Sequence, residues 1–238
     1  MRCPSLGPVT QDSPATPDDD ADAGATAPAY PAAPWPLQGS MWLTLFRLAR
    51  DADEAHPAGV YGAAFVDYTE PSPLTYSELL VSRLVRRGEP GSVGGRVQPG
   101  SITDIWVDSP ASMAGGRALW AIPKWLCDFD MESEQRGPVR RTRWAASLER
   151  RPIAAARFTD VSAVAPRTPF GLALWQPGLP AGEPQGGEGP KQSGMRGSGR
   201  SLPARAHWEI DPDGPLAYLR AARQLASVRI RDFRIDFG

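Results

Sequence analysis

Apolar and polar positions alternate along most of the chain, and this pattern favours strands over helices. The clearest run is Ser101–Asp108, whose period of two is typical of a half-buried strand. Similar runs, rich in apolar, β-branched and aromatic residues, predict strands over Ser40–Leu48, Val60–Tyr68, Leu74–Val85, Arg140–Ser147, Ile153–Val161, Phe170–Gln176, Ala204–Ile210 and Leu225–Phe237. In the last run the alternation changes phase between Ile230 and Phe233, which predicts a β-bulge.

Two segments favour helix. Ser109-Pro110 is a typical helix start, because serine caps free N–H groups and proline fits the first helical position. We expect this helix to continue through about Ala121, and a second, shorter one over Asp213–Arg220. Many strands with only two brief helices predict a β-rich α+β domain with a sandwich-like or closed arrangement of antiparallel strands.

The composition divides the chain into a tail and one domain. Residues 1–34 are rich in proline, alanine and aspartate, and such a segment buries too little apolar surface to offset its ordering entropy. We therefore predict a disordered tail over 1–34 and a domain over 35–238. Many glycines and prolines over 177–199 predict a flexible loop between two strands.

The overall charge excludes several classes of function. A net charge of −1 gives no electrostatic reason to expect nucleic acid or membrane binding. The chain shows no apolar run of about 20 residues, no signal-peptide pattern, no phosphate-binding glycine loop and no zinc-ligand spacing. We expect a cytoplasmic protein without a cofactor or metal, and exposed strand edges favour a homo-oligomer.

Lysine is rare in this sequence. Two lysines, Lys124 and Lys191, stand against twenty-four arginines, and Lys124 lies in the apolar run 119–129. Arginine stays protonated, whereas a desolvated lysine can lose its proton near neutral pH and act as an amine nucleophile. One interpretation of Lys124 is therefore a Schiff-base lysine. The other is a lysine that caps carbonyl groups at a helix end and extends its ammonium into water.

Other polar residues in apolar surroundings are candidate partners of this lysine. Glu78 shares a strand face with Tyr76 and could position a substrate or move a proton, although the spacing alone favours a solvent-facing strand charge. Asp67 has the same two interpretations. Arg117 precedes the lysine on the predicted helix, where it would either bind a substrate carboxylate or tie the helix to neighbouring acids.

The run Val107–Lys124 (VDSPASMAGGRALWAIPK) resembles the acetoacetate decarboxylase superfamily. In that family a helix of small residues leads into Gly-Arg and then into Pro-Lys, and an upstream Tyr-x-Glu strand matches Tyr76-Ser77-Glu78. The resemblance implies antiparallel strands enclosing a hydrophobic pocket. It also implies that Lys124 is the Schiff-base amine and Glu78 a pocket acid.

Two positions differ from the family's decarboxylases. The residue after the Schiff-base lysine is a second lysine in that family and Trp125 here, where we expect it to contact substrate together with Tyr76. The family's arginine before the first core strand is missing, because Gly39-Ser40 precede Met41. Members without the second lysine are better suited to other imine chemistry, such as aldol or dehydration reactions.

The sequence therefore supports two main functional hypotheses. The first is a lyase that forms a Schiff base between Lys124 and a small keto acid or related carbonyl compound, followed by decarboxylation or by aldol or dehydration chemistry. The second is a non-catalytic domain that binds a small ligand in the same pocket. A third and weaker hypothesis is a structural subunit whose acidic tail recruits a partner.

Overall fold

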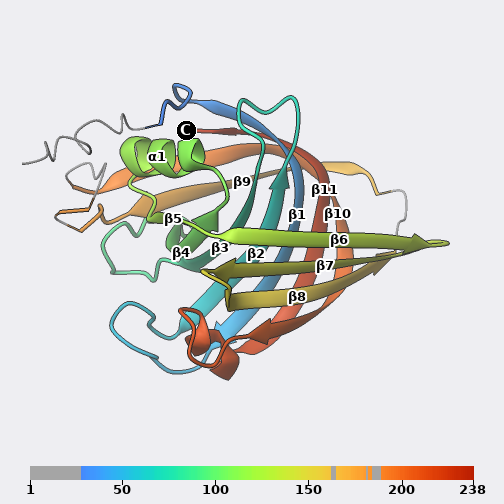
Figure 1. Ribbon diagram of the computed structural model, residues 1–238. Coiled ribbons are helices and arrows are strands. Elements are labelled where there is room, and N and C mark those ends of the chain that lie inside the picture. Colours follow the sequence, from blue (N-terminus) through green and yellow to red (C-terminus); the bar gives the residue numbers. More distant parts are fainter. Residues whose placement is uncertain (1–27, 162–164, 181, 184–188) are drawn as a thin grey trace, which may run out of the picture.

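Seven strands of the protein close into a ring. The computed structural model describes residues 28–161, 165–180, 182–183 and 189–238. Around the ring the strands follow the order β11-β1-β2-β3-β4-β9-β10, and β10 pairs back onto β11 (Figure 1). These strands are β1 (Trp35–Leu48), β2 (Gly59–Tyr68), β3 (Tyr76–Leu84), β4 (Gly100–Val107), β9 (Arg167–Gln176), β10 (Lys191–Ile210) and β11 (Arg223–Phe237). The β-rich α+β class predicted from the sequence is confirmed.

A second layer of strands extends from the ring along β10. The last residues of β10 pair with β8 (Arg151–Val161), which continues to β7 (Val139–Leu148) and β6 (Asp128–Arg136). The helix α1 (Pro110–Trp120) lies across one end of the ring, and the short strand β5 (Lys124–Leu126) follows it (Figure 1). A single 3-10 turn, η1 (Ala217–Ala221), precedes β11. No helix in the described ranges is both long and apolar enough to cross a membrane.

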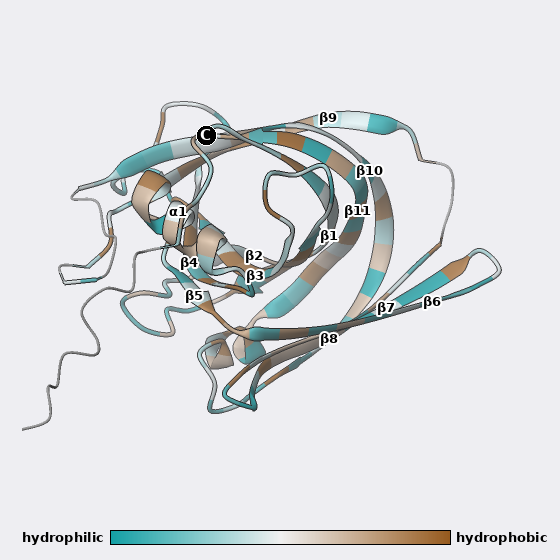
Figure 2. Ribbon diagram, turned by 45° about the horizontal axis from the view of Figure 1, so that its top comes forward, coloured by the Kyte–Doolittle hydropathy of each residue, from teal (hydrophilic) through white to brown (hydrophobic). Residues whose placement is uncertain are grey.

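The strands of the ring bury side chains on both of their faces. On β2, Ala64, Val66 and Tyr68 point into the ring and form part of what we call the inner core. The alternate residues Tyr61 and Phe65 face outward into a second cluster, the outer core, which β7, β8 and β10 cover. Figure 2 shows brown and teal segments following one another along β10 and β11.

The ring has one weak seam, between β4 and β9. Only Gly100 and Leu174 pair there, in parallel. Beyond that pair the two strands do not exchange backbone hydrogen bonds, and the buried side-chain amide of Gln176 takes their place. Its Oε1 accepts hydrogen bonds from the backbone N–H of Ile102 (2.9 Å) and from Ser101 Oγ (3.1 Å), and its Nε2 donates to the carbonyl of Ile102 (3.1 Å).

Most strands predicted from the sequence are present, as is the helix that begins after Ser109. The register of β1 against β11 shifts between Gly39 and Met41, which confirms the bulge between Ile230 and Phe233. The proposed tail over 1–34 falls largely outside the described residues, and β1 begins at Trp35. The predicted helix over Asp213–Arg220 is shorter and begins later than expected.

One prediction needs correction, and one strand was not predicted. The described residues 191–199 of the expected loop belong to β10. Their glycines are needed for strand pairing, since a Cβ on Gly197 would lie 2.0 Å from the carbonyl oxygen of Arg234. The strand β6 was not predicted, because its sequence DFDMESEQR is polar and almost fully exposed and therefore lacks a buried face.

We predict that Gln176→Ala destabilises the fold by about 2–4 kcal/mol, because it leaves the buried N–H and C=O of Ile102 without partners. Chemical denaturation measures this loss. The control is Gln192→Ala, at an exposed position of β10, which should change the free energy of unfolding by less than about 0.5 kcal/mol. Equal effects of the two substitutions would contradict the role given to Gln176.

Candidate active site

The ring encloses a small apolar cavity beneath α1. The cavity has a volume of about 60 Å³. Its polar or ionisable lining residues are Tyr68, Tyr76, Glu78, Ser82 and Lys124. The rest of the lining is aliphatic, aromatic or thioether and consists of Trp35, Leu37, Met41, Leu80, Ile102, Ile105, Trp120, Ile122, Leu172, Leu174, Met195, Ile235 and Phe237. The cavity is therefore a hydrophobic pocket whose polar residues, apart from Ser82, gather in one corner.

A buried ion pair forms that corner. Lys124 Nζ lies 2.9 Å from Glu78 Oε2, and the two side chains are 5% and 4% exposed. The ammonium also donates to Ser112 Oγ at 2.9 Å and lies 3.5 Å from the hydroxyl of Tyr76. The hydroxyl of Tyr68 donates to the second carboxylate oxygen of Glu78 at 3.1 Å.

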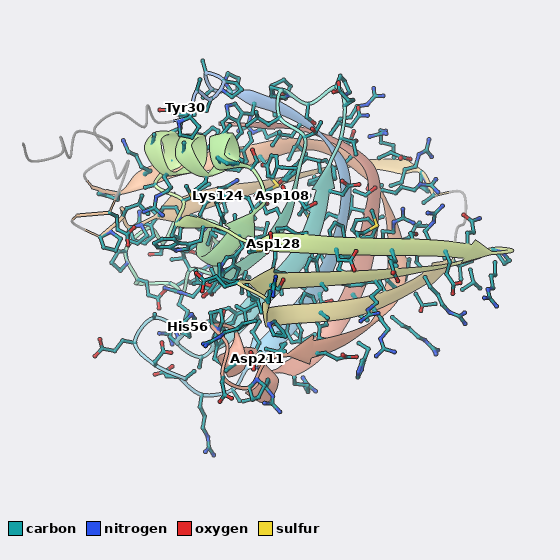
Figure 3. The ribbon with its side chains drawn as sticks, viewed as in Figure 1. Tyr30, His56, Asp108, Lys124, Asp128 and Asp211 are labelled. Carbon is teal, nitrogen blue, oxygen red and sulfur yellow. The ribbon has the colours of Figure 1, made fainter. Side chains whose placement is uncertain are left out.

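These residues come together from four elements: β2, β3, α1 and β5. Glu78 occupies the inner face of β3 by simple alternation with Tyr76. The end of α1 is closed by hydrogen bonds from the N–H groups of Ala121 and Ile122, and Ala121 adopts a left-handed conformation (φ 52°). The chain then turns at Pro123, and Lys124 starts β5, which pairs in parallel with β4. Lys124 consequently points back beneath α1 (Figure 3).

The Gly115-Gly116 pair allows α1 to approach the cavity closely. A Cβ on Gly116 would lie 2.8 Å from Cδ and 2.9 Å from Cε of Lys124. A Cβ on Gly115 would lie 2.6 Å from the ring of Trp35, which itself packs edge-on against Trp120 at 4.8 Å. Both glycines are therefore required by close contacts: one with the lysine stem and one with the aromatic wall.

Burial and charge act in opposite directions on Lys124. Burial alone lowers the pKa of Lys124, but the carboxylate of Glu78, together with Tyr76, more than reverses this and holds the pKa above its ordinary value. Burial also raises the pKa of Tyr68 and Tyr76, so both remain neutral phenols. The resting site is an ammonium–carboxylate pair, and Lys124 becomes a nucleophile only after giving up a proton.

The other site residues predicted from the sequence lie elsewhere. Arg117 is buried, but it donates to the carbonyl of Lys124 (3.0 Å), pairs with Glu183 and lies over the ring of Trp125. Trp125 is 50% exposed and does not line the cavity. Asp67 is half-buried on the outer face of β2, where burial and the nearby Asp108 raise its pKa. Of the four predicted substrate contacts, Tyr76 alone lines the cavity.

Two contacts were missed by sequence reasoning. Ser112 lies on α1 as one of a run of small residues, and only its distance to Lys124 reveals its importance. Tyr68 is the last residue of β2 and lies on the same face as Ala64 and Val66, so the sequence pattern predicts an ordinary aromatic core residue. The alternation along β2 places it in the inner core, but only the antiparallel pairing of Tyr68 with Tyr76 shows that it adjoins Glu78.

The fold and site together define a β-rich domain that holds a lysine–carboxylate pair inside an apolar pocket. Residues 52–176, just over half of the chain, match the family profile of acetoacetate decarboxylase (ADC), and the chain belongs to this family. No curated protein sequence gives a significant match.

Solved structures show the same fold at low sequence identity. The enduracididine biosynthesis enzyme MppR is 15% identical with a TM-score of 0.59, over 92% of this chain and 95% of that one. The acetoacetate decarboxylase of Legionella pneumophila is 13% identical (TM-score 0.58; 92% and 90%). An acetoacetate decarboxylase-like enzyme of Sphingomonas wittichii is 15% identical (TM-score 0.56; 87% and 91%).

We predict that Glu78→Gln lowers the pKa of Lys124 below its ordinary value, because it removes the carboxylate that most strongly opposes the effect of burial. In the native protein, folding raises the pKa of Lys124. The ion pair therefore contributes its full stability below the ordinary lysine pKa, and this contribution is lost as the pH rises through the higher folded-state pKa. Acylation of Lys124 by a small amine-reactive reagent should therefore reach half its maximal rate at least about one pH unit lower in the variant.

Peptide mass mapping between neutral and alkaline pH measures this profile. Lys191, the other lysine, serves as the reference in the same sample. Unchanged profiles for Lys124 in the native protein and the variant would show that Glu78 does not control its protonation.

Proposed function

We propose that this protein is an enzyme of the acetoacetate decarboxylase family that forms a Schiff base between Lys124 and a small carbonyl substrate. The observation that carries this proposal is the buried contact of Lys124 Nζ with Glu78 at the wall of an apolar cavity. Because the pair is enclosed, a proton can pass between the two groups without exchange with bulk water.

The first steps use groups already in contact. Lys124 passes a proton to Glu78, and the neutral amine adds to the carbonyl carbon to give a carbinolamine. Glu78 then returns the proton to the carbinolamine hydroxyl, which leaves as water, so that a protonated imine faces a carboxylate. The hydroxyls of Ser112 and Tyr76 lie close enough to Nζ to hold the carbinolamine oxygen.

The protonated imine then withdraws electrons from the adjacent bond. Glu78 can remove a proton from the neighbouring carbon to give an enamine, which attacks a second carbonyl compound in an aldol step or expels a β-hydroxyl as water. Cleavage of a carboxylate from that carbon would give the same enamine by decarboxylation. The structural relative MppR has been seen with the condensation product of pyruvate and imidazole 4-carboxaldehyde, which supports including aldol-type chemistry.

We predict that borohydride reduction in the presence of a carbonyl compound adds the reduced substrate to Lys124, and that Lys124→Arg abolishes the adduct. Arginine keeps the charge but cannot form an imine. Mass mapping locates the adduct, and Lys191→Arg is the matched control, which should label like the native protein. No adduct on Lys124 with a broad panel of ketones and aldehydes, together with unchanged ligand binding in Lys124→Arg, would favour a non-catalytic binding domain.

We also predict that Gly116→Ala slows formation of the adduct by between about 10- and 100-fold, because the new methyl group displaces the stem of Lys124 from its position beside Glu78. The rate of reductive trapping measures the effect. The control is Gly94→Ala, where an added Cβ meets no atom within 4 Å. Equal trapping rates in the two variants would show that the position of the lysine stem is not critical.

A further inference from the structure

The described residues that line the cavity offer no charge to balance an anionic substrate. Lys124 and Glu78 are its oppositely charged lining residues, they neutralise each other, and the phenols of Tyr68 and Tyr76 stay uncharged. We propose that the substrate is a neutral, apolar ketone or aldehyde and not a keto acid. This inference rests on the Schiff-base function proposed above and specifies its substrate class.

The positive charge of Lys124 cannot form an ion pair with a substrate carboxylate. It already faces Glu78 at 2.9 Å, and the ammonium must lose its proton before it can attack a carbonyl group. After the imine forms and is protonated, its one positive charge again faces the one negative charge of Glu78. A substrate carboxylate would therefore stay unpaired in an apolar enclosure throughout the reaction, and burial of an unpaired ion is strongly unfavourable.

Neither Arg117 nor Arg196 lines the cavity. Arg117 binds the carbonyl of Lys124 and Glu183 and does not line the cavity. Arg196 follows Met195 on β10. Because successive side chains on a strand point to opposite faces, Met195 enters the cavity and Arg196 is exposed on the outside.

The walls suit a hydrocarbon chain attached to the carbonyl group. Away from the ion pair the cavity is bounded by residues such as Leu172, Leu174 and Ile102, and Met41 and Met195 add flexible thioether side chains that adapt to a ligand's shape. A neutral ketone has no carboxylate to lose, so the imine would lead to removal of a proton from the adjacent carbon and to bond formation or cleavage of the aldol type.

A matched pair of ketones tests this inference. Levulinate carries a carboxylate, and methyl isoamyl ketone has the same number of heavy atoms, with an isopropyl group in place of the carboxylate. Borohydride trapping on Lys124 is measured over a range of concentrations of each. We expect methyl isoamyl ketone to reach half-maximal labelling at a concentration at least about tenfold lower. In a series of methyl ketones, each added methylene should improve labelling about fourfold until the cavity is filled.

Two substitutions at Met41 sharpen the test. Met41→Arg places a cation in the cavity wall and should shift the preference toward levulinate, whereas the uncharged Met41→Gln should not. Labelling by levulinate equal to or better than that by the neutral ketone in the native protein would overturn the substrate class and leave the Schiff base intact. Labelling by neither ketone, nor by any of the wider panel, would overturn the proposed function and this inference with it.

Discussion

The ion pair between Lys124 and Glu78 is the interaction on which the rest of the site depends. Two charges inside an apolar ring are stable only if each is closely paired and its remaining hydrogen-bonding capacity is met. Ser112 and Tyr76 meet this need for the ammonium, and Tyr68 meets it for the carboxylate. Removal of one charge would leave the other unpaired, so this pair and its hydrogen bonds constrain four elements of the fold at once.

The ring can hold such a pair because the strands pack against the second layer through their outer faces and line the cavity with their inner faces. The outer faces of β1, β2 and β3 pack against the second layer in an aromatic-rich core, in which Phe65 stacks on Trp144 and Trp208. That packing holds the strands in place. The inner faces are then free to leave a small cavity open, and α1 covers one end of the ring through the close contacts that its two glycines permit.

The sequence predicts the chemical pair better than it predicts the pair's surroundings. Lys124 stands out because lysine is rare here, and the alternation along β3 assigns Glu78 to the same face as Tyr76. The contacts of Ser112 and Tyr68 depend on how α1 and β2 meet β3, which no local pattern encodes. Arg117 looks like a carboxylate-binding residue in the sequence, but the turn after α1 makes the carbonyl of Lys124 its partner. The first half of β10 was not predicted as a strand, because its glycines are typical of loops. In the structure these glycines permit close strand pairing.

The most direct test of covalent chemistry at Lys124 uses the rarity of lysine in this chain. With lysine labelled by ¹⁵N at Nζ, the protein should give two side-chain nitrogen signals, one for Lys124 and one for Lys191. On addition of a neutral apolar ketone, without any reductant, the signal of Lys124 should move from the ammonium region to that of a protonated imine, while the signal of Lys191 stays in place. If both signals remain in the ammonium region at saturating ketone, Lys124 does not form a Schiff base.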